Sequence, residues 1–252
     1  MQRSPDFNDQ VIVLKVGQFR EADCWVRFLA STQGIMTAFA FGGAKSRKRF
    51  AGCLDVLNHV QFQVVAQGRG QYFSLQEGCL LNRFSSLQKN LARLGMAVNC
   101  LKFLEAAHIG TGNASEVFRL FLQTLLVLDQ GNRVPQSLPI LFRARLAALY
   151  GYQASLRYCV ACGLDLYPAQ LAFFSIAKGN TFCAGCLRPD KTGVPLRGLD
   201  IASLEAIFNA RPHDWSQDSL YQDLPKPVLQ ALDRFVIMHL ELVWENGRFR
   251  QC

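Results

Sequence analysis

The segment 158–187 reads YCVACGLDLYPAQLAFFSIAKGNTFCAGCL and decides the fold of the second half of the chain. It holds two Cys-x-x-Cys pairs, Cys159 with Cys162 and Cys183 with Cys186, and twenty residues separate the two pairs. Each pair puts two sulfurs on one tight turn, and the intervening segment can bring the two turns face to face. The spacing therefore predicts a zinc ribbon at residues 158–187, with a tetrahedral site made of four thiolates.

Two disulfides, or four unrelated buried cysteines, are the alternative interpretations of this segment. Thiols stay reduced in the cytosol, which argues against disulfides, and the regular spacing argues against unrelated cysteines. A site with four protein ligands has no open position for water, so the predicted zinc, one per chain, is structural. A thiol-dependent enzyme would instead need a free reactive thiol among the four.

Length and composition predict a globular chain with a polyanionic partner. Half of the 252 residues are hydrophobic, and 27 Lys and Arg against 19 Asp and Glu give a net charge of +8. A basic surface favours a partner such as nucleic acid. The N-terminus has no apolar segment of signal-peptide length, and no apolar run reaches the roughly 18 residues of a spanning helix. We therefore expect a cytoplasmic, nucleoid-associated protein with no membrane contact.

Five short apolar segments in the first eighty residues predict strands, at 10–16, 24–30, 35–41, 54–65 and 71–79. Gly68 and Gly70 form the turn between the last two. Helical periodicity starts only at Asn82, so these strands are expected to close into a barrel of their own. A five-stranded oligonucleotide-binding (OB) barrel is the leading prediction, and an SH3-like barrel is the alternative.

The loop after the third predicted strand is strongly basic, with Lys45, Arg47, Lys48 and Arg49 within five residues. On a rigid barrel such a loop can hold a phosphodiester backbone while nearby aromatic side chains stack on bases. A solvated charged turn is the alternative for an isolated run of cations. The barrel context and the net charge favour nucleic acid. The candidate stacking rings are Trp25, Phe39, Phe41 and Tyr72.

From residue 82 the apolar period becomes helical. The pattern predicts helices from Ser85 to about Ile109, from Ser115 as N-cap to Leu128, at 139–150, at 199–210, and from Pro225 or Pro227 to Val243. The polar segment 211–224 predicts a loop. We therefore expect an α+β chain, with an OB-fold domain at 1–81 and a helical domain at 82–252 that carries the zinc ribbon.

The sequence holds no recognisable catalytic motif. A phosphate-binding Gly-x-x-x-x-Gly-Lys segment is absent. Glu105 and His108 have the spacing of a di-iron ligand pair, but a second copy of the pair is missing. We therefore predict that the chain is not an enzyme.

These features together resemble the RecO family of bacterial recombination mediators. The resemblance covers nearly the whole chain and rests on the order and spacing of five segments: 17–23 (GQFREAD), 42–50 (GGAKSRKRF), the four-cysteine ribbon, 232–240 (LDRFVIMHL) and 247–250 (GRFR). The resemblance implies an N-terminal OB fold, a central helical bundle and a zinc ribbon.

The same resemblance implies binding of single- and double-stranded DNA and annealing of complementary strands. It also implies cooperation with RecR and single-stranded DNA-binding protein to load RecA. The basic loop is the implied DNA contact, and Arg20 and Arg27 of the same barrel are further candidates. In the family, the helical domain holds the acidic, Phe-terminated tail of single-stranded DNA-binding protein. By position, the candidates for that contact are Arg119, Arg143 and Arg145, with Phe118, Phe121 and Phe142 beside them.

A zinc-bearing RNA-binding or ribosome-associated module is the alternative function, because the same barrel and charge would serve RNA. Competition between ribosomal RNA and single-stranded DNA would distinguish the two functions.

Overall fold

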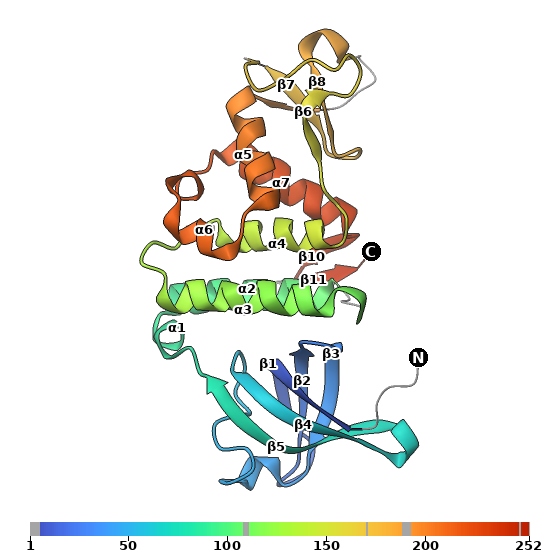
Figure 1. Ribbon diagram of the computed structural model, residues 1–252, viewed down its shortest axis with the longest axis vertical. Coiled ribbons are helices and arrows are strands. Elements are labelled where there is room, and N and C mark those ends of the chain that lie inside the picture. Colours follow the sequence, from blue (N-terminus) through green and yellow to red (C-terminus); the bar gives the residue numbers. More distant parts are fainter. Residues whose placement is uncertain (1–5, 108–110, 170, 188–192, 247, 252) are drawn as a thin grey trace. The chain divides into compact units, whose positions relative to one another are not determined.

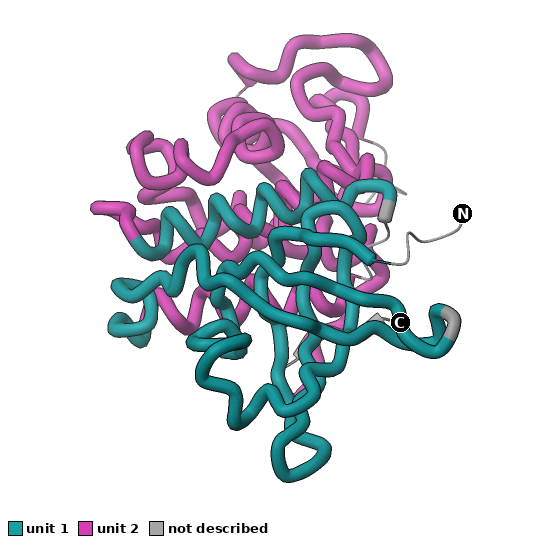
Figure 2. The backbone as a smooth tube through the Cα atoms, turned by 60° about the horizontal axis from the view of Figure 1, so that its bottom comes forward, with its two compact units in different colours: residues 1–91, 108–129 teal, residues 92–107, 130–252 magenta. Residues whose placement is uncertain are grey.

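The computed structural model describes residues 6–107, 111–169, 171–187, 193–246 and 248–251. The contacts divide the chain into two compact units, shown in Figure 2: residues 1–91 with 108–129, and residues 92–107 with 130–252. The predicted domain boundary between residues 81 and 82 stays a prediction. The predicted α+β class, with an N-terminal five-stranded barrel and a helical region that carries a four-cysteine cluster, is confirmed.

The first unit contains a closed barrel of five strands (Figure 1), namely β1 (Asp6–Gln18), β2 (Cys24–Ala30), β3 (Gly34–Ala40), β4 (His59–Gln67) and β5 (Tyr72–Asn82). The strands follow one another around the barrel in the order β1-β2-β3-β5-β4. All neighbours are antiparallel except β3 and β5, which meet in parallel at Phe39 and Ser74. This closed order is that of an OB-like barrel, as predicted.

Alternation of side chains along the strands fills the barrel with an apolar core. In β2, Val26 and Phe28 are fully buried, while Trp25 and Arg27, which alternate with them, are half-buried. The ring of Phe62 in β4 lies 5.7 Å from that of Phe28, centroid to centroid. Because the core is closed by side chains inside the barrel, the residues on its outer face are free to serve another purpose.

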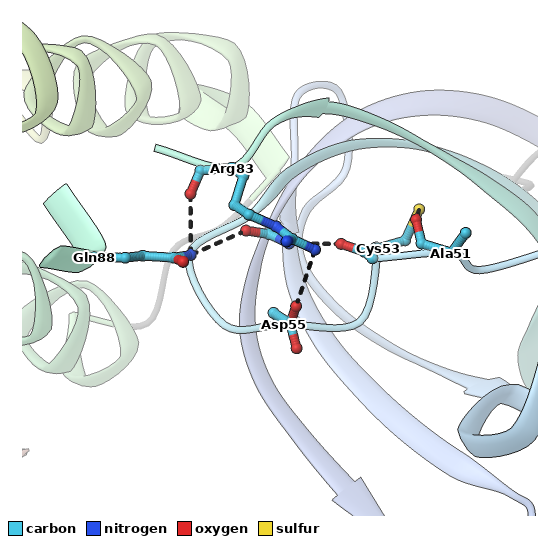
Figure 3. A network of polar contacts seen from close by, with 7 residues as sticks. Ala51, Cys53, Asp55, Arg83 and Gln88 are labelled. Atoms are coloured by element: carbon cyan, nitrogen blue, oxygen red, sulfur yellow. Dashed lines mark hydrogen bonds and ion pairs between the residues drawn. The ribbon is translucent and has the colours of Figure 1, made fainter. Parts of the chain in front are cut away.

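The residues before β4 form a structured loop, although the pattern predicted a strand from residue 54. Figure 3 shows the polar contacts that hold this loop. Arg83 Nη2 lies 3.7 Å from Asp55 Oδ2, and Gln88 donates a hydrogen bond to the carbonyl of Arg83 at 3.0 Å. The side chain of Asn58 donates a hydrogen bond to the carbonyl of Gly52 in the loop at 2.7 Å. These contacts tie the loop to the end of β5 and to α1 (Ser85–Lys89).

Two helices complete the first unit, α1 and α3 (Ala114–Gln130). The backbone N–H of Leu87 in α1 donates to Asp129 Oδ1 of α3 at 2.8 Å. Phe118 of α3 is buried, and its ring lies 5.8 Å from that of His59 in β4. Because α3 already begins at Ala114, Ser115 is not the N-cap that the sequence predicted.

Helices form most of the second unit: α2 (Leu91–Ala106), α4 (Leu138–Leu149), α5 (Gly198–Asn209), α6 (Pro212–Gln217) and α7 (Lys226–His239). Helix α4 packs against α5 and α7. The helix predicted from Ser85 to Ile109 is in fact two, because the chain is extended at Asn90. His108 and Ile109 lie outside the described residues. Within the described residues, every helix is too short or too polar to cross a bilayer.

The predicted loop at 211–224 is wrong, because this polar segment contains α6 and a 3-10 turn, Ser219–Tyr221. Pro212 opens the helix, and the side chain of Asp214 accepts a hydrogen bond from the backbone N–H of Arg211 at 2.8 Å. Both are ordinary helix-start signals. One fully buried side chain, Trp215, anchors the short helix, and the polar composition around it concealed the pattern.

The last helix is shorter than predicted. It ends at His239, and the chain continues as a hairpin of β10 (Leu242–Glu245) and β11 (Arg248–Gln251). Val243, which the helical pattern put on an apolar face, lies in β10. Glu241 has a φ of 52°, a conformation that ends helices. The dipeptide Asn246-Gly247 is typical of tight hairpin turns and is the sequence signal that could have indicated this hairpin.

The four-cysteine segment belongs to a four-stranded sheet of β6 (Ser155–Cys159), β8 (Asn180–Cys183), β7 (Ala172–Ser175) and β9 (Val194–Leu196), in that order. The predicted ribbon at 158–187 contains only β7 and β8 in full, so the sheet extends beyond it at both ends. Phe174 of β7 lies 5.7 Å from Phe235 of α7, and Phe208 of α5 lies at the same distance on Phe235. Ring contacts therefore anchor the sheet on the helices of the second unit.

Candidate nucleic-acid interface and metal centre

Two segments with predicted DNA-contacting residues lie side by side on the barrel. Asp23 Oδ1 accepts a hydrogen bond from the backbone N–H of Gly42 at 2.8 Å, and the N–H of Ala44 donates to the carbonyl of Ala22 at 3.0 Å. Gly42 has a φ of 69°, which glycine adopts without strain. The turn 19–23 and the basic loop 43–50 therefore form one surface.

Four aromatic side chains gather on the same barrel, and we call them the ring patch: Phe19, Phe39, Phe41 and Tyr72. The ring centroid of Phe39 lies 5.3 Å from that of Phe19, 6.1 Å from that of Phe41 and 5.8 Å from that of Tyr72. Phe19, Phe41 and Tyr72 each keep 40% of their surface exposed. Large rings are mostly buried in folded proteins, so a cluster of exposed rings indicates a binding surface.

The sequence predicted three rings of this patch and missed Phe19. Its neighbour Arg20 was named, but nothing in the local sequence shows that the turn 19–23 lies against β3. Trp25, the fourth ring that the sequence predicted, is the cross-strand neighbour of Phe39. Its indole covers Gly17, where an added Cβ would lie 2.3 Å from the ring, so a glycine is required there.

The predicted DNA-contacting cations differ in what they already contact. Lys45 Nζ lies 2.5 Å from Glu21 Oε1, and both side chains are exposed. Arg20 lies over the ring of Phe19, with 5.7 Å from guanidinium carbon to centroid. Arg47 and Lys48 are exposed and form no hydrogen bond or ion pair through their side chains with any residue that the structure describes. These two side chains are therefore the most available to phosphate groups.

Arg49 holds the basic loop in place. Its Nη2 donates to the carbonyl of Phe41 at 2.5 Å and its Nη1 to the carbonyl of Gln76 at 3.3 Å. Its own carbonyl accepts from the N–H of Gly78 at 2.8 Å. Arg49 therefore joins the loop to the end of β3 and to β5. Arg27, the remaining candidate of the barrel, is half-buried within β2.

The four cysteines of the ribbon come together as predicted. The sulfur atoms of Cys159, Cys162, Cys183 and Cys186 all lie within 4.8 Å of one another. The sulfurs of Cys162 and Cys183 are 3.8 Å apart, the separation of roughly 3.8 Å that follows from metal–sulfur bonds of about 2.3 Å in a tetrahedron. All four are free thiols, which contradicts the disulfide alternative. This cluster could hold a metal ion.

The surroundings of these thiols also suit a cation. Burial raises the pKa of Cys159, but the N–H groups of Cys183, Ala161 and Cys162 outweigh that effect and lower the pKa to about 6. The neighbouring thiols of Cys183 and Cys162 raise the pKa of Cys186 to about 12. Four thiolates repel one another at this distance, and a cation between them removes the repulsion.

The three arginines predicted to bind a partner's tail lie in different surroundings. Arg119 is exposed on α3 in the first unit. Arg145 of α4 donates to the carbonyl of Phe208, and burial lowers its pKa. Arg143 of α4 is 8% exposed. Its Nη1 lies 2.5 Å from Asp233 Oδ1, so its charge is already compensated. The phenylalanines predicted beside these arginines are all buried core residues: Phe118, Phe121 and Phe142.

Comparison with known proteins gives a consistent result over the whole chain. Residues 1–84 match the family model "Recombination protein O N terminal", and residues 88–248 match "Recombination protein O C terminal". A protein named DNA repair protein RecO from Nitratidesulfovibrio vulgaris (strain DP4) is 40% identical over 249 residues, which cover 98% of this chain and 99% of the relative. One of the same name from Oleidesulfovibrio alaskensis is 38% identical over 246 residues, covering 98% and 99%.

Proposed function

This chain belongs to the RecO family of DNA repair proteins, and from that premise we propose that it is a recombination mediator. It binds single- and double-stranded DNA and anneals complementary strands. Together with RecR it helps to load RecA onto DNA coated by single-stranded DNA-binding protein. This activity belongs in the cytoplasm, at the nucleoid. Membership in the family supports the prediction that the chain is not an enzyme.

The observation that carries this proposal is the joint surface of the ring patch and the basic loop. Exposed rings can stack on unpaired bases, and Arg47 and Lys48 can contact phosphates at the same time. A duplex hides the faces of its bases, so it gains only the phosphate contacts. The surface therefore favours single strands and still tolerates duplex DNA.

Stacking also suits the annealing of complementary strands. A protein that holds bases by their faces and by their phosphates leaves the hydrogen-bonding edges free. A second strand can then test those edges for complementarity while the first strand is still bound. Binding of this kind depends little on sequence, because every base has a stacking face.

Zinc is the ion that the four-cysteine cluster suits best. Four thiolates on two Cys-x-x-Cys turns form the ligand set of structural zinc sites, and the cluster already has the required sulfur spacing. With four protein ligands such a site holds the fold of the ribbon and activates no water. One zinc per chain in freshly purified, reduced protein is the expected result of metal analysis, and protein without zinc would contradict it.

Arg119 is the remaining candidate for the tail of single-stranded DNA-binding protein. That tail combines acidic residues with a terminal Phe, so its capture needs an apolar surface with an available cation. Arg143 and Arg145 already donate to other groups, whereas Arg119 is exposed on α3. Arg119→Ala should weaken binding of the tail and leave binding of naked DNA unchanged.

Annealing of coated strands tests the proposed function. Complementary strands are coated with single-stranded DNA-binding protein, either complete or without its acidic tail, and annealing is followed with and without this chain. The chain should anneal naked strands in every case and should anneal coated strands only when the tail is present.

Failure to anneal naked strands would contradict the proposed function outright. Equal annealing with and without the tail would leave a DNA-annealing protein that lacks the mediator's partner contact. Ribosomal RNA serves as competitor in the same assay. If it displaces single-stranded DNA at lower concentration than unlabelled DNA does, the RNA-binding alternative is favoured.

A further inference from the structure

A cavity of about 260 Å³ lies within the second unit, between three helices and the terminal hairpin. Pockets for drug-sized ligands measure roughly 300–1,000 Å³, so this one has room for a single ring system rather than a larger ligand. Helices α2, α4 and α7 and both strands of the hairpin contribute to its lining: Asn99, Arg143, Asp233, Ile237, Trp244 and Phe249.

Aromatic rings form one side of the cavity. Trp244 of β10 is 50% exposed, and its ring lies 4.5 Å from that of Phe249 in β11, centroid to centroid. Phe249 is buried and also contacts Phe103 of α2 at 5.1 Å. The tryptophan is therefore held by a buried ring while half of its own surface stays open. A fixed, open indole is a platform on which a flat ligand can stack.

The charge at the cavity is balanced. Arg143 lies 2.5 Å from Asp233 through Nη1 and donates to Asn99 Oδ1 through Nη2 at 2.7 Å. Its guanidinium also lies over the ring of Phe249, at 4.6 Å, and over that of Phe103, at 5.4 Å. An acidic peptide would gain little from a cation that is already paired, and it would meet the carboxylate of Asp233. The cavity therefore suits a neutral ring.

Two polar side chains at the cavity keep hydrogen-bonding capacity. Asn99 uses its carbonyl oxygen for Arg143, and its Nδ2 donors have no partner in the described part of the chain. Asp233 uses Oδ1 for the same guanidinium, and its Oδ2 likewise has no partner there. The Nδ2 group of Asn99 is a donor and Oδ2 of Asp233 is an acceptor, and the guanidinium of Arg143 holds both side chains. This pair matches a base that offers a ring-nitrogen acceptor and an exocyclic amino group. Cytosine and adenine carry both groups, and thymine has no amino group.

We propose that this cavity binds one unstacked base of single-stranded DNA, and that it prefers cytosine or adenine to thymine. The base stacks on Trp244 and exchanges hydrogen bonds with Asn99 and Asp233. The proposal rests on the proposed function, because it takes DNA to be the ligand. A base in a single strand leaves its neighbours at low cost, so no duplex has to open. Exposed Arg234, next to Asp233 on α7, can contact the adjoining phosphate.

Tryptophan fluorescence tests the cavity separately from the barrel. Trp215 is fully buried and Trp25 lies in the barrel beside Phe39, so the difference between wild type and Trp244→Phe isolates the signal of Trp244. The probes are oligo(dC) and oligo(dT) of equal length, with binding followed in parallel by anisotropy of a label on the DNA. Oligo(dC) should quench Trp244 more than oligo(dT) at saturation. It should also bind about three- to tenfold more tightly, the effect expected for one or two hydrogen bonds.

Trp244→Ala should abolish the preference for oligo(dC). Tyr158→Ala, which removes an equally exposed ring at 51% from the four-stranded sheet, should leave the preference unchanged. Oligonucleotides that bind without any change at Trp244, or that quench it equally, would overturn this inference and leave the proposed function standing. Absence of oligonucleotide binding would overturn both. Quenching by an acidic peptide with a terminal Phe, and not by DNA, would make the cavity a peptide site and overturn the inference.

Discussion

The barrel and the four-cysteine sheet are both small β structures, but different forces hold them. The barrel closes around fully buried rings such as Phe28 and Phe62. The four-cysteine sheet instead exposes apolar side chains beside its thiols, with Tyr158 at 51%, Val160 at 56% and Leu164 at 54% exposure. A small sheet with so much exposed apolar surface gains little folding free energy from burial. A bound metal would supply the missing stabilisation.

The difference decides where functional residues can sit. In the barrel, the exposed rings of the ring patch and the exposed side chains of Arg47 and Lys48 lie outside the core, so they can serve binding without holding the fold. In the ribbon, the chemically distinctive residues are the four cysteines, and with the proposed zinc bound they would hold the fold themselves. Substitutions in the two regions should therefore separate into losses of binding and losses of structure.

Cys183→Ser should have the largest effect on structure. Zinc in small four-ligand modules contributes on the order of 10 kcal/mol to folding, and removal of one thiolate loses much of that free energy. The ribbon should lose its zinc, and the amides of β7 and β8 should exchange rapidly with solvent. Amides of the barrel should stay protected, as measured by hydrogen–deuterium exchange. Cys79→Ser, which changes an exposed thiol of β5 outside the cluster, is the matched control.

The double substitution of Phe19 and Phe41 by Ala should have the largest effect on binding. Stacking contributes about 1–3 kcal/mol per base, so loss of two rings should weaken single-strand binding at least tenfold. Duplex binding should change little, because stacked base pairs cannot use the rings. Replacement of both by Leu keeps apolar surface without the ring faces. This variant should have stability near that of wild type and should still bind single strands weakly. Equal losses for single and double strands would count against the ring patch.

Arg49→Ala should cost stability, in contrast to its neighbours in the loop. Arg49 donates to the carbonyls of Phe41 and Gln76, and hydrogen bonds from an exposed charged donor of this kind are worth about 1–2 kcal/mol together. Lys48→Ala removes the same charge from a side chain without such bonds and should stay within about 0.5 kcal/mol of wild type. Urea denaturation compares the two variants. Equal stability would show that the arginine does not hold the loop.

A small pH dependence should come from His59 in the barrel. Burial lowers the pKa of His59 below its ordinary value of 6.5, so the folded state favours the neutral ring. The unfolded chain takes up the proton first as pH falls. Stability should therefore decrease as pH drops through 6.5 and level off below the folded pKa. His59→Gln should flatten that part of the profile, and an unchanged profile would assign the dependence to other groups.

The sequence predicted the parts of the fold that depend on local patterns. Short apolar segments predicted five strands that close into a barrel, and the spacing of the Cys-x-x-Cys pairs predicted four sulfurs in one cluster. Both patterns are fixed by backbone geometry over a few residues. The hairpin β10–β11 was missed because Val243 continued a helical apolar period by coincidence.

Contacts between distant segments could not be predicted in the same way. Phe19 joins the ring patch because the turn 19–23 lies against the basic loop, where Asp23 accepts a hydrogen bond from Gly42. Arg143 looked like an available cation from position alone, yet Asp233, ninety residues further on, pairs with it. Whether a charged side chain already has an ion-pair partner within the protein depends on tertiary contacts, and the residue type does not reveal those contacts.

The central claim is that the exposed cations of the basic loop contact the phosphates of single-stranded DNA. It is tested most directly by the salt dependence of binding for the double variant Arg47→Ala with Lys48→Ala. Each phosphate contact contributes about 0.7 to the slope of log K against log salt for single strands, so two lost contacts should make the slope shallower by about 1.4. Lys178→Ala with Lys226→Ala removes two exposed cations from the second unit and should leave the slope unchanged. A loop variant with the wild-type slope, or a control that loses as much, would contradict the claim.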